Sequence, residues 1–394
     1  MLIKRVAQGL FEKLASTHKI VAVVGPRQAG KTTFLKEQMA LGKEVVYVSL
    51  DDPTAKSLFD ADVKKFEQQY MDKRKIIILD EVQYGKDAGP KLKYLADTGY
   101  KLWVSASSQI LLEANVLSHL AGRVGILTLY PFSIDEFMNA KGQKSYTSDI
   151  FKRLVWEHAA YGGYPHVVLT EDLESKELLL KNLYTTVLLK DTMRGFGIEG
   201  QDGLERLAKY AAINIGREFH ESAVSSQLGI SAPTVRKYIS ALEKSYLLKR
   251  IYPFFTNKNH ELVKMPKIYL ADCGMRNAIM DHFPGELEEG LLFENYILTE
   301  LLKRGYNVKY WKTKNKAEVD FVIERGKDVI PIEVKLFADG KIGRSLHSFI
   351  EKYSPTRAFV VSCRGETMQQ TIGKTTIDFT TVEGLLPAHV FFNM

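Results

Sequence analysis

The sequence predicts an α/β fold whose N-terminal part is built around a mainly parallel sheet. Between about residues 19 and 130, short apolar runs such as IVAVV, VVYVSL and IIIL alternate with amphipathic stretches. Runs that are apolar throughout, rather than at every second position, are typical of strands covered on both faces. The length of 394 residues also suggests two or three domains at roughly 150 residues each.

Four regions differ in their pattern. We predict a parallel-sheet domain over 1–135, a helical domain over 136–218, a helix–turn–helix with a hairpin over 219–285, and a domain of one helix followed by alternating strands over 286–394. Charge is concentrated in the third region. Residues 221–270 hold eight Lys and Arg against three Glu, a net +5 of the chain's +7, and such a cluster favours a nucleic-acid partner.

The composition favours a soluble globular protein of the cytoplasm. Apolar residues make up 45% and charged residues 26% of the chain, and no apolar run approaches the ~20 residues of a membrane-spanning helix. The first residues carry charges such as Lys4 and Arg5, so they lack the apolar region of a signal peptide. The only cysteines are Cys273 and Cys363, which excludes a disulfide scaffold and a four-cysteine zinc site.

A glycine-rich loop lies between the strand KIVAVV and the helix TFLKEQMA, the context of a Walker A phosphate-binding loop. Its glycines let backbone N–H groups surround phosphate oxygens, and the following helix adds the partial positive charge of its N-terminus. We expect Lys31 to reach the β- and γ-phosphates of ATP and Thr32 to bind Mg²⁺. The predicted ATP-binding residues are Gly25, Pro26, Arg27, Gln28, Ala29, Gly30, Lys31, Thr32 and Thr33.

Two carboxylates end the strand KIIILDE about 48 residues after the loop, as in a Walker B motif. We expect Asp80 to hold Mg²⁺ through water, and Glu81 to orient or deprotonate the attacking water. The next strand, YKLWVSAS, brings Ser107 and Ser108 to the same edge of the sheet. There Ser107 either senses the γ-phosphate or caps the helix that follows.

Arg123 precedes the strand VGILTLY. One interpretation makes it an arginine finger that stabilises the charge of the transition state, supplied by a neighbouring chain of a homo-oligomer. The other makes it an ordinary surface arginine.

Residues 219–271 predict a winged helix. Residues 223–228 form its first helix, Gly229 the turn and Ser231 the N-cap of the second helix, whose inner face carries Val235, Ile239 and Leu242. A helix of this kind fits the major groove of DNA, and lysines in the wing suit phosphates. The alternative is a spacer between domains. The residues expected to contact DNA are Thr234, Arg236, Lys237 and Lys258.

The stretch AEVDFVIERGKDVIPIEVK predicts a hairpin that turns between Gly326 and Lys327, so that the numbers of paired residues sum to 653. One face is then wholly apolar. Its members are Val319, Phe321, Ile323, Ile330, Ile332 and Val334.

On the other face of this hairpin Asp320 lies across from Glu333, and Glu318 across from Lys335. Opposed carboxylates repel each other unless a positive charge lies between them. A divalent cation would supply that charge, and Lys335 would activate or orient water. The alternative is a hydrated surface with a weak Glu318–Lys335 pair.

The motifs GPRQAGKTT, SLDDP, LDEVQ and LAGRV…LYPFSIDEF resemble those of a prokaryotic family of AAA+ ATPases. Members of this family carry a C-terminal domain of unknown function related to restriction-endonuclease-like nucleases. The resemblance continues through GGYP, SAPTVRKYISALEKSYLL and FENYILTELLKRGY to AEVDFVI…IPIEVK. Two departures are Ser105-Ala106, where the pattern has Thr-Gly, and Val319, where it has proline.

The resemblance implies an AAA+ ATPase domain with a helical lid, a winged helix and a restriction-endonuclease-like domain. It also implies that Glu294, Asp320 and Glu333 bind a second Mg²⁺ or Mn²⁺ beside the catalytic Lys335. The expected function is ATP hydrolysis coupled to DNA binding or processing, with nuclease activity left open. The alternative is an ATP-driven regulatory switch or binding module whose nuclease-like domain is catalytically silent.

Overall fold

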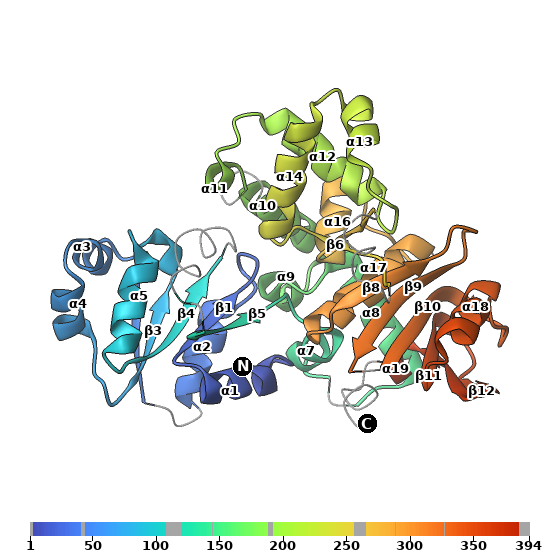
Figure 1. The fold of residues 1–394 in the computed structure, drawn as a ribbon, viewed down its shortest axis with the longest axis horizontal. Coiled ribbons are helices and arrows are strands. Elements are labelled where there is room, and N and C mark those ends of the chain that lie inside the picture. The colour runs from blue at the N-terminus through green and yellow to red at the C-terminus, as the bar shows by residue number, and fades with distance from the viewer. Residues whose placement is uncertain are drawn as a thin grey trace. The chain divides into compact units, whose positions relative to one another are not determined.

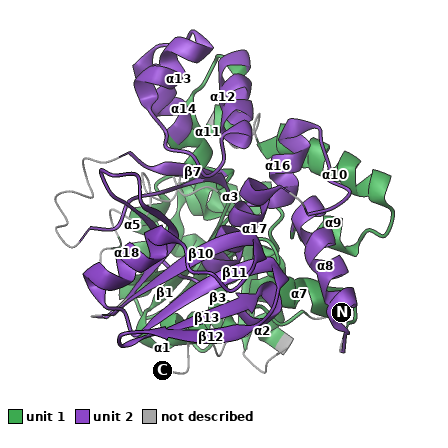
Figure 2. Cartoon of the chain, turned by 90° about the vertical axis from the view of Figure 1, so that its right-hand side faces the viewer, with its two compact units in different colours: residues 1–143, 163–201, 240–247 green, residues 144–162, 202–239, 248–394 purple. Residues whose placement is uncertain are grey.

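In the computed structural model the chain folds into two compact units (Figures 1 and 2). Unit 1 comprises 1–143, 163–201 and 240–247, and unit 2 comprises 144–162, 202–239 and 248–394. Because the chain passes repeatedly from one unit to the other, the units cut across the four predicted regions, whose boundaries stay predictions. The residues that the structure describes are 3–40, 44–107, 120, 122–143, 145–187, 192–255, 265–287, 289–326 and 328–385.

Unit 1 contains a five-stranded sheet in the order β2-β3-β4-β1-β5. All neighbouring strands are parallel, with Ile20 of β1 beside Leu102 of β4 and Val124 of β5. This confirms the predicted parallel α/β sheet. The strands are β1 (Ile20–Val24), β2 (Val45–Ser49), β3 (Ile76–Asp80), β4 (Lys101–Ala106) and β5 (Val124–Thr128).

Helices cover both faces of this sheet, which explains why most strand positions on both faces are apolar. On one face, α1 (Gln8–Thr17) and α2 (Lys31–Ala40) pack through Phe11 and Phe34 against alternate strand residues such as Val21. On the other face, α3 (Pro53–Ala61), α4 (Val63–Tyr70) and α5 (Ala88–Asp97) pack against the intervening residues such as Ala22 and Leu79. A short 3-10 helix, η1 (Val82–Tyr84), follows β3.

Further helices complete unit 1. Ser133 and Glu136 form a capping box at the start of α7, which satisfies backbone donors that would otherwise lack partners. Pro165 occupies the first position of α9, where a missing N–H costs nothing. The helices are α7 (Ile134–Ala140), α9 (Pro165–Leu169), α10 (Leu173–Thr186) and α11 (Arg194–Phe196).

The helix–turn–helix region forms as predicted at the level of its elements. Gly229 has a φ of 64° in the turn, and the Ser231 hydroxyl accepts the N–H of Thr234 at 3.3 Å as a cap. The predicted inner face, Val235, Ile239 and Leu242, is fully buried. The elements of this region and its surroundings are α8 (Ser148–Tyr161), α12 (Gln201–Ile213), α13 (Glu221–Leu228), α14 (Ala232–Lys244), β6 (Leu248–Ile251), β7 (Lys267–Leu270) and α16 (Cys273–Met280).

The C-terminal part of unit 2 is a six-stranded mixed sheet in the order β12-β13-β11-β10-β9-β8. Strand β11 is parallel to both β10 and β13, and the other pairs are antiparallel. Helix α18 packs on one face through Leu346, Phe349 and Ile350. The elements are α17 (Gly290–Lys303), β8 (Val308–Lys312), β9 (Glu318–Arg325), β10 (Asp328–Ala338), α18 (Arg344–Tyr353), β11 (Arg357–Gly365), β12 (Met368–Ile372), β13 (Thr375–Thr381) and α19 (Val382–Leu385).

The predicted register of the β9–β10 hairpin is confirmed. Ile330 lies beside Ile323 and Ile332 beside Phe321, so the numbers of each pair sum to 653. The ladder ends at that second pair, and the expected pair of Asp320 and Glu333 would lie just beyond it.

The prediction that successive side chains of β9 point to opposite faces of the sheet was wrong near Asp320. Asp320 and Phe321 together lie opposite the single residue Tyr310 of β8. This β-bulge inserts one extra residue and re-aims the side chains that follow it. As a result Val319 packs in the same core as Val322, although the two should point to opposite faces of a regular strand.

Within the described ranges, no helix is long and apolar enough to cross a membrane.

Candidate functional site

The loop between β1 and α2 requires glycine at both ends. Gly25 has a φ of 151°, and a Cβ there would lie 2.1 Å from the carbonyl oxygen of Leu129. Gly30 has a φ of 90°, in the region that L-residues avoid. These conformations bring the backbone of the loop around to the N-terminus of α2, where phosphate oxygens meet N–H groups.

Lys31 lies over this loop with its side chain buried. Its ammonium donates to the carbonyl oxygens of Gly25, at 3.0 Å, and Pro26, at 2.9 Å. The charge is therefore held at the concave side of the loop by weak neutral acceptors. A phosphate oxygen is a stronger acceptor because the hydrogen bond is then charge-assisted.

Asp80 connects the two predicted motifs. Its buried carboxylate accepts hydrogen bonds from the Thr32 hydroxyl and the Tyr47 hydroxyl, each at 2.8 Å, and from the Ser105 hydroxyl. Burial, together with the Asp80 carboxylate, raises the pKa of Tyr47, so Tyr47 stays a donor. The adjacent oxygens of Thr32 and Asp80 are hard ligands of the kind that Mg²⁺ prefers.

Glu81 follows directly in a left-handed conformation, with a φ of 55°. Its N–H donates to the Ser105 hydroxyl at 3.0 Å, and its carboxylate accepts from the side-chain amide of Gln83. Gln83 also donates to the Ser107 hydroxyl at 3.1 Å. The predicted sensor Ser107 thus connects to Glu81 through Gln83, whereas Ser105 contacts Asp80; Ser108 lies outside the described residues.

Arg5 is a buried residue of this site that the sequence motifs did not indicate. Its guanidinium donates to the carbonyl oxygens of Ala29, at 3.1 Å, and Tyr130, at 2.6 Å, and lies 3.0 Å from the carboxylate of Glu136. It therefore holds the phosphate-binding loop against the start of α7. The sequence contained only a charge near the N-terminus, without a spacing that pointed to the loop.

Arg123 lies at the opposite edge of the sheet from the loop. Its carbonyl oxygen accepts the N–H of Ile20, the first residue of β1, whereas Gly25 follows the last residue of that strand. The Arg123 side chain is 40% exposed and pairs with Asp97 at 3.0 Å. A role of Arg123 at a phosphate would therefore require the loop of another chain.

A second set of charged residues gathers in unit 2 around Lys267 of β7. The Lys267 ammonium lies 2.6 Å from the carboxylate of Glu318 and 3.6 Å from that of Glu294, and its side chain is only 3% exposed. Glu294 also accepts the Tyr269 hydroxyl at 2.5 Å. The residues of this cluster, called the Lys267 cluster below, are Lys267, Glu294, Lys312, Glu318 and Asp320.

Asp320, at the bulge of β9, is the least compensated carboxylate of the cluster. It accepts the N–H of Val334 at 2.7 Å. Burial, followed by the negative charge of Glu294, raises the pKa of Asp320 to about 7, although the positive charge of Lys267 opposes this shift. Asp320 and Glu294 therefore share the positive charge of Lys267.

The predicted pairing of the other hairpin residues is different in the structure. Glu318 pairs with Lys267 and with Lys312 (3.1 Å), and Lys335 pairs with Glu333 at 3.1 Å. The reason is that the β9–β10 ladder ends before these positions. In the part of the chain that the structure describes, no three His, Cys, Asp or Glu side chains are grouped closely enough to hold a metal ion. The predicted ligand set of Glu294, Asp320 and Glu333 is therefore not assembled in this conformation.

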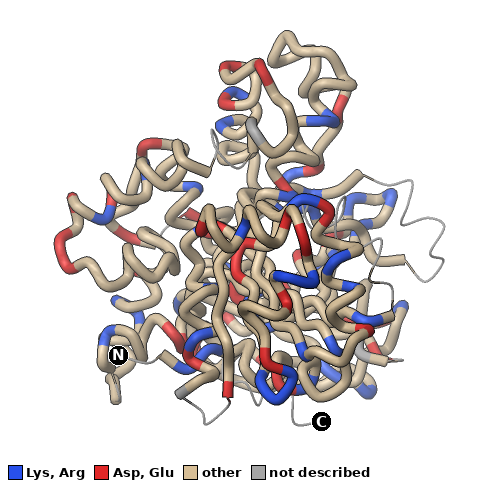
Figure 3. Tube along the Cα trace, turned by 90° about the vertical axis from the view of Figure 1, so that its left-hand side faces the viewer, with Lys and Arg blue, Asp and Glu red and all other residues tan. Residues whose placement is uncertain are grey.

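The basic residues of the helix–turn–helix region divide into different environments. On α14, Arg236 and Lys237 are exposed, while Thr234 is partly buried and its hydroxyl contacts Ser231. Arg236 pairs with Glu221 at 2.7 Å. Lys258 lies outside the described residues. Figure 3 shows Lys and Arg interspersed with Asp and Glu along the trace of the chain.

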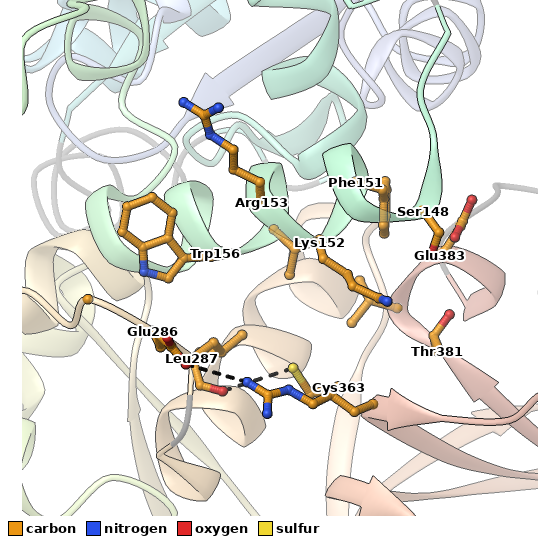
Figure 4. A pocket seen from close by; sticks show the side chains of 14 residues that line it. Ser148, Phe151, Lys152, Arg153, Trp156, Glu286, Leu287, Cys363, Thr381 and Glu383 are labelled. Carbon is orange, nitrogen blue, oxygen red and sulfur yellow. Dashed lines mark hydrogen bonds and ion pairs between the residues drawn. The ribbon is translucent and has the colours of Figure 1, made fainter.

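A cavity of about 290 Å³ opens elsewhere in unit 2 (Figure 4). Phe151, Val155 and Trp156 of α8 supply much of its apolar lining, with Leu287 and Val382. Burial raises the pKa of Cys363, which also lines it. None of the predicted site residues lines this cavity.

Comparison with known proteins agrees with the geometry of the N-terminal part. Residues 17–138 match the family model of the AAA domain. The match includes the loop, Lys31, Asp80, Glu81 and Arg123, and it supports an ATPase of the AAA type. Two families of unknown function match the rest of the chain, DUF8612 over 152–285 and DUF4143 over 289–382.

Relatives and solved structures extend the similarity beyond the AAA domain. An uncharacterized protein of Haemophilus influenzae is 25% identical over 81% of this chain and 82% of its own length. The uncharacterized protein Rv2008c of Mycobacterium tuberculosis is 24% identical over 87% of this chain and 76% of its own. The Walker-type ATPase PABY2304 of Pyrococcus abyssi is similar in fold, with a TM-score of 0.51 and 13% identity over 71% of this chain and 96% of that one.

Proposed function

We propose that this chain binds ATP with Mg²⁺ and hydrolyses it at the loop between β1 and α2. The observation that carries the proposal is the 2.8 Å contact between the Thr32 hydroxyl and Asp80, next to Lys31 over the loop. Thr32 and, through water, Asp80 would hold Mg²⁺, which neutralises phosphate charge when it is bound. Lys31 would bind the β- and γ-phosphates, and Glu81 would orient the attacking water or accept its proton.

The test is phosphate release from ATP by the full chain in the presence of Mg²⁺. Lys31→Ala removes the charge that contacts phosphate, so ATP binding and hydrolysis should both fall. Lys13→Ala is the matched control, because Lys13 is an exposed lysine of α1. Equal activity of wild type and the Lys31→Ala variant would refute the proposal.

We further propose that ATP turnover is coupled to DNA binding by the region around α14. The exposed Arg236 and Lys237 support this, since the pair of Arg236 with Glu221 lies at the surface and costs only about 0–1 kcal/mol to break. Thr234 and Lys258 belong to the same predicted contact. In this proposal 136–218 acts as a lid and 219–285 as a winged helix.

The salt dependence of DNA affinity tests this contact. Each phosphate that a basic side chain neutralises adds a slope of about −0.9 to the plot of log affinity against log salt concentration. Replacing Arg236 and Lys237 by Ala should flatten the slope by about two units if both contact phosphate. Lys64→Ala with Lys65→Ala, two exposed lysines of α4, is the control pair. An unchanged slope in the α14 variant would make this region a spacer.

One observation favours the second candidate function, an ATP-driven switch whose C-terminal domain is catalytically silent. The order of α17, the strands β8–β10, α18 and β11 supports a restriction-endonuclease-like fold for 286–394. The ligands that nuclease activity would need, however, are separated, and Lys267 lies among the carboxylates. Nicking of plasmid DNA with Mn²⁺ distinguishes the two functions, because a silent domain leaves the plasmid supercoiled.

A further inference from the structure

We propose that the ammonium group of Lys267 takes the place of a divalent metal ion in the C-terminal domain. The proposal rests on the restriction-endonuclease-like fold proposed for 286–394, and it concerns what occupies that site. The resemblance implies a metal among Glu294, Asp320 and Glu333, and the geometry does not fit one. Glu294 and Asp320, together with Glu318, instead surround a lysine that comes from β7, outside the predicted domain, while Glu333 pairs with Lys335.

The position of Lys267 is fixed by the backbone around it. Its strand pairs with β6, where Lys267 lies beside Ile251. The backbone of Lys267 also forms an isolated antiparallel β-bridge with that of Glu218. The ammonium lies 5.5 Å from the centre of the Tyr310 ring, beside the bulge of β9. The side chain is thus directed between α17 and β9, the elements that carry Glu294, Glu318 and Asp320.

The charges in the cluster show why a cation is needed there. The carboxyl groups of Glu294, Glu318 and Asp320 face the ammonium groups of Lys267 and Lys312, and Lys312 also pairs with Glu218. The Lys267 ammonium lies 2.6 Å from Glu318 and 3.6 Å from Glu294, and both contacts favour the charged form of the lysine. Removing Lys267 would leave Glu294 and Asp320, which are partly buried, without their nearest positive charge, which is destabilising.

Lys312 provides a matched comparison. It pairs with the same Glu318 at 3.1 Å and also with Glu218 at 3.3 Å, but its side chain is 31% exposed against 3% for Lys267. Water can occupy the exposed position of Lys312 after its loss and cannot as readily occupy the buried position of Lys267. The two lysines thus differ in burial and share one partner.

The experiment is thermal unfolding of the nucleotide-free full chain in EDTA and in millimolar Mn²⁺, with binding of Mn²⁺ measured alongside. The change in melting temperature between EDTA and Mn²⁺ should be no larger for wild type than for the Lys312→Met variant. In EDTA, Lys267→Met should melt several degrees lower than wild type. Mn²⁺ should restore most of this loss, and the variant should bind one more Mn²⁺ ion per chain than wild type does. Lys267→Arg should behave as wild type, because it keeps the charge.

Two results would overturn the proposal. One is a wild-type melting temperature that rises with Mn²⁺ as much as that of Lys267→Met, since metal would then bind beside the lysine. The other is a Lys267→Met protein that neither binds nor responds to Mn²⁺. If Lys267→Met folds poorly, the Lys267→Met/Asp320→Asn variant, with one carboxylate fewer, should fold without metal and bind Mn²⁺ more weakly. Equal binding by both variants would contradict the proposal. ATP hydrolysis, measured on the same preparations, reports separately on the function of the AAA domain.

Discussion

Glu300 of α17 is a fully buried carboxylate whose neighbours keep it charged. Its oxygens lie 3.0 Å from Lys303, 2.7 Å from Arg304 and 3.9 Å from a ring nitrogen of His158. Burial raises the pKa of Glu300, but the positive charges of Lys303, Arg304 and His158 outweigh it and lower the pKa to about 2. The side chain therefore contributes to stability only in its ionised form.

Acid should remove this contribution. Because the folded pKa lies below the unfolded value of about 4.3, the stability is fully present above that value and is lost as the pH falls toward 2. Glu300→Gln should lower the free energy of unfolding at pH 7 by an amount on the order of 3 kcal/mol, and the loss should shrink between pH 5 and 2. Urea unfolding across this range measures it, with the exposed Glu366→Gln as control. A loss that stays constant with pH would contradict the assignment.

Arg5 connects the N-terminal segment with the phosphate-binding loop and with α7, through the Ala29 carbonyl oxygen and a buried ion pair with Glu136. Arg5 and Glu136 are each about 5% exposed. Arg5→Met should destabilise the chain by about 3–5 kcal/mol, because it leaves Glu136 unpaired. It should also weaken ATP binding, because the Ala29 carbonyl loses its partner.

A double-mutant cycle tests this connection between elements. Glu136→Gln keeps an acceptor for the N–H groups of Val6 and Ser133 while removing the charge. Arg5→Met combined with Glu136→Gln should therefore cost less than the sum of the two single changes. Strict additivity in urea unfolding would show that Arg5 and Glu136 act independently.

Local patterns predicted much of the fold and several of the residues that lie together at the loop between β1 and α2. Unbroken apolar strands predicted the parallel sheet, and the order of Gly25, Lys31, Thr32 and Asp80 predicted the contact between loop and carboxylate. The sum of 653 predicted the register of the β9–β10 hairpin. These features depend on residues that are close in sequence or that follow a known spacing.

The features that sequence analysis missed depend on distant residues. Lys267 precedes Asp320 by 53 positions, and no periodicity connects a lysine of one strand with carboxylates of another. The bulge at Asp320 breaks the two-residue alternation without a glycine or proline to mark it. Arg5, Tyr47 and Ser105 are likewise single polar residues whose partners are defined only after the chain has folded.

The position of Arg123 makes oligomerisation of the chain a testable part of the proposed mechanism. Since Arg123 lies at the sheet edge away from its own loop, an arginine finger would have to act on a neighbouring chain. ATPase activity per chain should then rise with protein concentration. Lys31→Ala chains mixed with Arg123→Ala chains should regain activity, because one kind of interface keeps a complete loop and an intact Arg123. Asp97→Asn serves as a control for loss of the surface pair. Constant specific activity on dilution, without rescue on mixing, would limit Arg123 to its pair with Asp97.

The Glu81→Gln variant tests whether ATP binding and ATP cleavage depend on different residues of the proposed ATPase site. Glutamine keeps the shape of Glu81 and its contact with Gln83 but cannot accept a proton from water. The measurement is ATP binding and phosphate release by wild type, Glu81→Gln and the exposed control Glu12→Gln in Mg²⁺. Glu81→Gln should bind ATP as wild type does and release phosphate about 10²–10⁴-fold more slowly. Phosphate release by Glu81→Gln at the wild-type rate would show that Glu81 does not act on the attacking water.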